Sequence, residues 1–204
     1  MTNAVQMQVV HMVLPGILAY LMGSVTFGML VPRVMGTASD IRKEGSGNVG
    51  ATNVLRTQGK LQGALVLLGD ILKGVAAALV GLWLAGELGG SIAGVCAMLG
   101  HCFPVYFGFK GGKAVATAAG IVFALFPIAM LVLVPVFVGV IAISKMVSAG
   151  SLSAACALIL CVFVFGASMP VAVFCVVAAS LIIWKHEGNI RRIIAGTENK
   201  LGVK

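Results

Sequence analysis

Long apolar stretches, separated by short polar segments, make up most of this chain. A helix needs about 20 apolar residues to cross a bilayer, and several of the stretches reach or approach that length. Pro127 and Pro135 interrupt the longest run, and we expect a tight turn near Phe126 and Pro127. The stretches cover roughly residues 9–35, 61–84, 90–107, two parts of 114–144, 151–167 and 170–185. The pattern predicts an all-α integral membrane fold: one domain over residues 1–204, built as a compact bundle of seven transmembrane helices.

The composition supports a membrane location. Of the 204 residues, 60% are hydrophobic and only 10% are charged, whereas about a quarter of a soluble globular chain is charged. The net charge of +8 would suggest nucleic acid as a partner of a soluble protein, but in this apolar chain we expect the lipid bilayer and no nucleic acid. The five cysteines form no CxxC pair, so we expect no metal, no cofactor and no required disulfide.

The basic residues gather in every second connection between the apolar stretches. Of the 14 lysines and arginines, all but Lys73 lie in or beside the first, third and fifth connections or in the tail from Lys185 to Lys204. The connections near 85–90, 126–127 and 167–170 carry none. The positive-inside rule therefore predicts an external N-terminus, a cytoplasmic C-terminus and polar segments at the cytoplasmic face. Six spans would place the later basic segments outside, so the charge pattern favours seven.

Lys73 lies within the second apolar stretch, three residues after Asp70. This spacing places both side chains on one face of a helix. A charge inside a membrane is costly unless it is paired or faces a polar cavity. The two residues therefore form either a structural ion pair that holds helices together or a direct part of a polar site.

The first polar connection has the residue types that suit a phosphate. Gly45, Gly47 and Gly50 allow backbone conformations that other residues resist, and they let N–H groups close around an anion. Arg56 can bind a phosphate through two parallel hydrogen bonds. Four further side chains could donate hydrogen bonds: Ser46, Asn48, Thr52 and Asn53. The mixture favours a phosphorylated ligand over a flexible linker.

A second glycine-rich segment ends with Lys110, Gly111, Gly112 and Lys113, directly before a predicted helix. Glycines and lysines at the start of a helix are typical of anion binding. The segment is not a P-loop, because its glycine spacing is too short and Ala114 takes the place of the magnesium-binding Ser or Thr. Anchoring of the two lysines at the membrane interface is the alternative interpretation.

The tail adds a third polar group. His186 lies where the last apolar stretch ends, and Asn189 follows about one helical turn later on the same face. A single histidine is more often structural than catalytic. Here Arg192 and Glu198 follow as well, and the combination indicates a site.

Taken together, these segments resemble the bacterial acyl-phosphate-dependent glycerol-3-phosphate acyltransferases, the PlsY family. The resemblance runs from about Gly23 to Lys200. The matching segments are GSGNVGATNVLR at 45–56, GHCFP at 100–104, GFKGGK at 108–113, HxxNI at 186–190 and GTE at 196–198, with DILKG at 70–74 also similar. Two departures are visible: Ala114 stands where many members have glycine, and Glu187-Gly188 is a variant pair.

The resemblance implies a seven-helix enzyme of the bacterial plasma membrane with its active site at the cytoplasmic face. Such an enzyme transfers a fatty acyl group from acyl phosphate to the 1-hydroxyl of sn-glycerol 3-phosphate, giving lysophosphatidic acid and inorganic phosphate. This is the first step of phospholipid synthesis, and it implies a functional link to an enzyme that produces acyl phosphate. Carried over by position, the family's site residues are Ser46, Arg56, Lys113, His186 and Asn189, with Glu198 as a structural residue.

The chemistry needs no covalent enzyme intermediate, because acyl phosphate already has a good leaving group. We expect the acceptor hydroxyl to attack the acyl carbonyl directly, with Arg56 and Lys113 binding phosphate groups. Ser46 and Asn189 would orient the acceptor, and His186 would either orient it or act as the base. A substrate phosphate is the alternative base. Ser46 as an acyl-carrying nucleophile is a further alternative, although the sequence places no base beside it.

Two other functions compete with this interpretation. A transporter of a small phosphorylated solute could also use glycine-rich loops and a membrane ion pair, but the connections predicted to be external carry few binding groups. An acyl-CoA acyltransferase would show a His-x4-Asp pattern. The positions five residues after the three histidines are instead Gly16, Tyr106 and Arg191.

Overall fold

The computed structural model describes residues 2–37 and 39–202, and within them the regular elements are α-helices and short 3-10 helices. Lys204, counted above with the basic tail, lies outside the described residues. The chain divides into two compact units, Met1–Leu125 and Phe126–Lys204.

The first unit begins with two helices where the sequence predicted one stretch. Helix α1 (Thr2–Ser24) and helix α2 (Phe27–Val34) are bent by 43° at the break between them. Thr26 has an extended backbone, and its hydroxyl donates a hydrogen bond to the carbonyl of Ser24. Short polar side chains that bind nearby backbone groups compete with helix formation, which accounts for the break.

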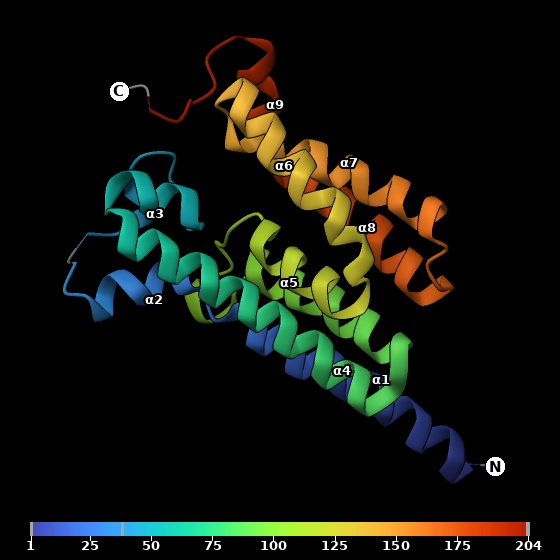
Figure 1. Ribbon diagram of the computed structural model, residues 1–204. Coiled ribbons are helices and arrows are strands. Elements are labelled where there is room, and N and C mark those ends of the chain that lie inside the picture. The colour runs from blue at the N-terminus through green and yellow to red at the C-terminus, as the bar shows by residue number, and fades with distance from the viewer. Residues whose placement is uncertain (1, 38, 203–204) are drawn as a thin grey trace. The chain divides into compact units, whose positions relative to one another are not determined.

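Helix α4 (Lys60–Cys102) contains a break and forms a helical hairpin. The backbone leaves the helical conformation at Ala85 and at Gly86, where φ is 63°. Figure 1 shows the chain reversing direction there, from teal into green. The two arms touch through Gly81 and Gly89, because a Cβ at either position would overlap the carbonyl oxygen of the other. The arms correspond to the predicted stretches 61–84 and 90–107.

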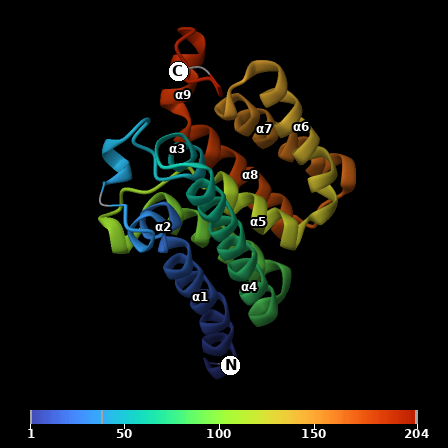
Figure 2. The same cartoon turned by 60° about the vertical axis from the view of Figure 1, so that its left-hand side comes forward.

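Helix α1 packs directly on the second arm of α4, and the two lie side by side in both overall views (Figure 2). Two glycines bring the backbones together. A Cβ at Gly23 would overlap the carbonyl of Ala97, and a Cβ at Gly100 would overlap the carbonyl of Tyr20. Small residues that permit such close approach are typical of helix packing in membranes.

The polar connections of this unit are more ordered than the sequence suggested. The first contains the 3-10 helix η1 (Ile41–Lys43) and the short helix α3 (Ala51–Thr57). The next contains the 3-10 helix η2 (Val105–Phe107) and leads into helix α5 (Val115–Leu125).

The second unit starts at the turn that the sequence predicted, where Phe126 precedes the 3-10 helix η3 (Pro127–Ala129). Helix α6 (Met130–Ser144) continues through Pro135, so the predicted interruption at Pro135 is wrong. The other helices are α7 (Val147–Phe165), α8 (Met169–Lys185) and α9 (Glu187–Ile194). Helices α6 and α7 pack against each other, and α8 and α9 are bent by 58° at His186.

Within the described residues, three helical segments are long and apolar enough to cross a membrane: Lys60–Phe107, Pro127–Ser144 and Val147–Phe165. The number rises to five if each bent pair counts as one span. The first of the three contains the α4 hairpin. Large apolar side chains point outward on both units, including Trp83, which is 83% exposed, and Ile143, which is 88% exposed. Such exposure is costly in water and suits a lipid environment.

Candidate active site

Asn53 organises the glycine-rich segment of the first unit. Its side chain is buried, and its Oδ1 accepts a hydrogen bond from the backbone N–H of Ser46 at 2.9 Å. Its Nδ2 donates to the carbonyls of Glu44, at 2.9 Å, and Ile41, at 3.3 Å. The sequence suggested that Asn53 contacts a ligand. The structure instead places its amide within the loop, where it fixes the path of the backbone.

The two glycines that flank Ser46 allow the loop to turn. Gly45 has φ 54° and Gly47 has φ 70°, a left-handed conformation that glycine adopts at little cost. A Cβ at Gly45 would also overlap Oδ1 of Asn53. As a result the Ser46 side chain lies at the exposed tip of the loop.

Asp40 fixes the entrance to this loop. Its carboxylate accepts a hydrogen bond from the backbone N–H of Arg42 and forms an ion pair with the guanidinium of Arg42 at 2.8 Å. The side-chain hydrogen bond from Arg42, aided by the backbone one, lowers the pKa of Asp40 to about 2. The same contact raises the pKa of Arg42. Asp40 therefore stays ionised at neutral pH, and it caps η1 as an anion.

A small hydrophobic cluster lies beneath the loop. Its buried members come from α2, the loop, α3 and α4, and they are Met29, Ile41, Val49, Val54 and Val66. Phe107, which opens the second glycine-rich segment, packs against the same cluster. A Cβ at Gly28 would overlap the Val49 carbonyl, so α2 presses directly on the loop. The two polar segments therefore share one support.

The other predicted residues of the first loop differ in exposure. Arg56, near the end of α3, has an exposed side chain, whereas Asn48 and Thr52 are half-buried. Of the residues that the sequence predicted to bind a ligand in this segment, Ser46 and Arg56 thus have polar side chains exposed at the surface of the unit.

The second segment is attached to the end of α4 by two backbone hydrogen bonds. The N–H of Gly111 donates to the carbonyl of Cys102 at 3.2 Å, and the N–H of Gly112 donates to the carbonyl of His101 at 3.0 Å. Lys113 follows and is half-buried, whereas Lys110 is exposed. Ala114 then adopts φ 58° directly before α5. A glycine would take this conformation more easily.

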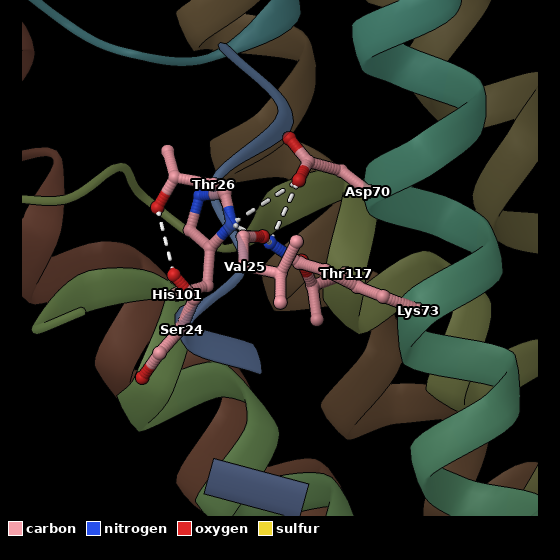
Figure 3. Close-up of polar contacts among 7 residues, drawn as sticks. All are labelled: Ser24, Val25, Thr26, Asp70, Lys73, His101 and Thr117. Carbon is pink, nitrogen blue, oxygen red and sulfur yellow. Dashed lines mark hydrogen bonds and ion pairs between the residues drawn. The ribbon is translucent and has the colours of Figure 1, made fainter. Parts of the chain in front are cut away.

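Asp70 and Lys73 form the ion pair that their spacing predicted, with 2.7 Å between Nζ of Lys73 and Oδ1 of Asp70. Lys73 also reaches the carbonyl of Val25 at 2.7 Å and Nδ1 of His101 at 2.9 Å. Figure 3 shows the pair together with Thr117, whose hydroxyl lies 3.3 Å from the same His101 nitrogen. Sequence reasoning assigned no role to His101, because its partner lies 28 residues away and no local pattern relates the two.

Glu198 contacts three polar residues of the second unit. Its Oε1 accepts hydrogen bonds from Nδ2 of Asn189, at 2.7 Å, and from the Ser148 hydroxyl, at 2.9 Å. Its Oε2 forms an ion pair with Arg192 at 2.8 Å. Burial raises the pKa of Glu198, but the hydrogen bonds from Asn189, Ser148 and Arg192 outweigh burial and hold the pKa below its ordinary value. Ser148 did not appear among the sequence-predicted residues.

His186 lies buried at the bend between α8 and α9. Its Nδ1 is 2.8 Å from the carbonyl oxygen of Ile182. A carbonyl can only accept, so Nδ1 carries the hydrogen, and in the neutral ring Nε2 carries the lone pair. Asn189 lies on the first turn of α9, and its amide is oriented by Glu198.

Comparison with known proteins places these features in a family. The family model for glycerol-3-phosphate acyltransferase matches residues 13–196. A glycerol-3-phosphate acyltransferase of Thermoanaerobacter pseudethanolicus is 41% identical over 194 residues, covering 95% of this chain and 98% of the relative. That of Roseobacter denitrificans is 46% identical over 190 residues, covering 93% and 94%.

Solved structures give the same result. The crystal structure of PlsY, an integral membrane glycerol 3-phosphate acyltransferase, in its glycerol 3-phosphate form superposes with a TM-score of 0.88 at 42% identity, covering 93% of this chain and 95% of that one. Its lysophosphatidic acid form gives a TM-score of 0.86 at 41% identity. The chain is thus a multi-pass membrane acyltransferase. More narrowly, it belongs to the PlsY family of glycerol-3-phosphate acyltransferases.

Proposed function

We propose that this protein transfers a fatty acyl group from acyl phosphate to the 1-hydroxyl of sn-glycerol 3-phosphate, releasing lysophosphatidic acid and inorganic phosphate. This would be the first step of phospholipid synthesis. The observation that carries the proposal is the shared support of two glycine-rich segments, because Phe107 packs on the cluster beneath the Ser46 loop. Each segment holds a basic residue, Arg56 or Lys113, and the reaction has two phosphate-bearing substrates.

The first unit would bind the phosphate groups. Arg56 can form two parallel hydrogen bonds with a phosphate, and Lys113 offers a compact positive charge. The Ser46 hydroxyl would hydrogen-bond the acceptor, while Asn53 would hold the loop in shape rather than contact the ligand. The matching PlsY structure in its glycerol 3-phosphate form supports a phosphate-bearing acceptor for this chain.

The second unit would act on the acceptor hydroxyl. Because Nδ1 of His186 donates to the Ile182 carbonyl, Nε2 is the nitrogen able to receive the hydroxyl hydrogen. The hydrogen bond from Asn189 to Glu198 fixes the plane of the Asn189 amide. The amide oxygen could therefore accept a hydrogen bond from a hydroxyl group of glycerol 3-phosphate. His186 would act as the base or as an orienting acceptor, with a substrate phosphate as the alternative base.

Acyl phosphate is the proposed acyl donor because its transfer demands little chemistry from the site. An acyl phosphate is a mixed anhydride, so positioning and charge stabilisation at the carbonyl oxygen can supply much of the rate. The attack forms the new ester bond and breaks the acyl–phosphate bond, the phosphate leaves with the electron pair, and the hydroxyl proton passes to the base. A separate enzyme that makes acyl phosphate would supply the donor.

We further propose seven spans, with the N-terminus outside and the site at the cytoplasmic face of a bacterial plasma membrane. Counting the arms of α4 as two spans, and α1, α5, α6, α7 and α8 as one each, gives seven. The basic residues then lie on one side, in line with the positive-inside rule. The two units would together form the single membrane domain.

An assay of the purified protein with radiolabelled glycerol 3-phosphate tests the function. Acyl phosphate, acyl-CoA and acyl carrier protein would be compared as donors, with Arg56→Ala as a site control. Product from acyl phosphate alone supports the proposal. Product from acyl-CoA or acyl carrier protein would reassign the donor. Absence of product from every donor would favour transport of a phosphorylated solute, which uptake into proteoliposomes would then reveal.

A further inference from the structure

His101 connects the buried ion pair of the first unit to the segment that carries Lys113. We propose that His101 is a positioning residue: its imidazole, held by Lys73, supports Gly112 and thereby sets the position of Lys113. The inference rests on the proposed function, in which Lys113 binds a phosphate group.

The contacts of Lys73 determine how the His101 ring is protonated and oriented. The ammonium group has three hydrogens and no lone pair. It donates to the Val25 carbonyl at 2.7 Å, forms an ion pair with Oδ1 of Asp70 at 2.7 Å, and lies 2.9 Å from Nδ1 of His101, to which it can only donate. Nδ1 must therefore present its lone pair, and the neutral ring carries its hydrogen on Nε2. Figure 3 shows Lys73 and Asp70 meeting the ring on this Nδ1 side.

The opposite edge of the ring touches the glycine-rich segment. A Cβ built on Gly112 would overlap Nε2 of His101, so only glycine fits against the ring. The backbone carbonyl of His101 also accepts from the N–H of Gly112 at 3.0 Å. Side chain and backbone of His101 thus both contact the residue that directly precedes Lys113. Asp70, Lys73, His101 and Gly112 form a continuous chain of contacts from the interior of α4 to Lys113.

Lys73 also contributes to the support of the first glycine-rich segment, the Ser46 loop. The Val25 carbonyl, which Lys73 contacts, lies in the break between α1 and α2. Helix α2 in turn presses through Gly28 on Val49 of the Ser46 loop. A rigid supporting shell is what keeps binding groups in place, and misplacement by about 1 Å can cost on the order of 100-fold in rate.

The first test compares His101→Ala with Lys113→Ala by steady-state kinetics of the full-length protein in detergent. If His101 positions Lys113, both variants raise the KM for the same substrate, about tenfold or more, with a smaller change in kcat. A loss that only reduces the fraction of folded enzyme would lower kcat and leave KM unchanged, and that result would overturn the inference. Ser91→Ala, a buried polar residue elsewhere on the same hairpin, serves as control and should keep both constants.

His101→Asn covers the case in which the alanine variant does not fold. The asparagine oxygen can take the place of Nδ1 as acceptor for Lys73, but the ring edge against Gly112 is lost. We expect a folded protein, eluting from size exclusion like the wild type, with the raised KM. A folded His101→Asn variant with wild-type KM would overturn the inference.

A double-substitution experiment isolates the contact itself. Gly112→Ala should raise KM because its Cβ meets the ring, and adding His101→Ala should remove the clash, so that the double variant is no worse than His101→Ala alone. Gly111→Ala is the matched control, because its Cβ would meet the His101 backbone carbonyl instead of the ring. His101→Ala should therefore not relieve Gly111→Ala. Additive losses in the Gly112 pair would overturn the inference.

The outcomes also separate this inference from the proposed function. If Lys113→Ala raises KM and His101→Ala does not, the function stands and the role of His101 is wrong. If Lys113→Ala leaves every KM unchanged, the binding role of Lys113 fails, and the inference fails with it.

Discussion

Asn189 donates a 2.7 Å hydrogen bond from Nδ2 to Oε1 of Glu198, nine residues further along the chain. The contact connects the segment that follows α9 to the first turn of the same helix. It also fixes which end of the Asn189 amide can face a substrate. In the proposed reaction, Glu198 would therefore act on glycerol 3-phosphate through Asn189, without having to touch the substrate itself.

Replacing Glu198 tests this relationship. Glu198→Gln keeps the shape but loses the negative charge shared by Asn189, Ser148 and Arg192. We expect a higher KM for glycerol 3-phosphate and a loss of about 1–3 kcal/mol in the free energy of unfolding, because buried polar groups lose a partner. Thermal unfolding in detergent and steady-state kinetics measure both. Glu187→Gln, which removes only the exposed pair with Arg191, should change stability by less than about 1 kcal/mol.

The lowered pKa of Glu198 also predicts a pH dependence. A carboxyl whose pKa is lower in the folded than in the unfolded state adds stability above its unfolded pKa, near 4.5, and loses it as pH falls toward the folded pKa. The melting temperature of the wild type should therefore decrease below about pH 4.5 more steeply than that of Glu198→Gln. Asp40 acts in the same direction in both proteins, so the difference between the two curves reports Glu198. Parallel curves would contradict the assignment.

His186→Gln tests the role of the histidine. A glutamine amide can still hydrogen-bond near the position of Nε2, but it cannot accept a proton at neutral pH. If His186 is the base, kcat falls by about 100-fold or more, as a single-turnover assay would measure. Retention of most of kcat with only a raised KM for the acceptor would assign the base to a substrate phosphate.

Asn53→Ala should disorganise the Ser46 loop. The substitution removes the acceptor for the Ser46 N–H and the donors to the carbonyls of Glu44 and Ile41. We expect a destabilisation of about 1–3 kcal/mol and a raised KM. Thr57→Ala, which removes only a hydrogen bond within α3, is the matched control. If Asn53→Ala raises KM without changing the melting temperature, Asn53 contacts the ligand directly after all.

Ala114→Gly should stabilise the protein. Ala114 has φ 58°, and the left-handed region costs a residue with a Cβ about 1–2 kcal/mol, part of which is offset by the greater freedom of glycine in the unfolded chain. We expect a higher melting temperature, with activity unchanged or increased. The control Ala118→Gly lies inside α5 and should instead destabilise by about 1 kcal/mol. Equal effects of the two substitutions would contradict the strain at Ala114.

Features that depend on neighbouring residues could be predicted from the sequence. The turn at Phe126-Pro127, the hairpin between 84 and 90 and the Asp70–Lys73 pair each arise within a few positions of one another. The glycines of the Ser46 loop likewise indicate from the sequence alone where the backbone adopts positive φ. Local spacing and turn chemistry are sufficient for such features.

Features that depend on packing between distant segments could not be predicted. His101 meets Lys73 only because glycines bring the arms of α4 together, and helices that are apolar all round show no periodicity to reveal which faces touch. Asn53 had the residue type of a ligand contact, yet burial in α3 directs its amide into the loop.

The turn of the α4 hairpin at Gly86 can tolerate a change in chain length, whereas the two arms of the hairpin cannot. Nothing lies within 4 Å of the position where a Cβ would project from Gly86, so extra residues there would only enlarge the turn. One residue inserted between 74 and 84 would rotate Lys73 by about 100° relative to everything beyond it and would separate it from His101. Insertions and deletions among natural relatives should therefore collect at this turn, and the 12 or so residues on either side of it should keep a constant length.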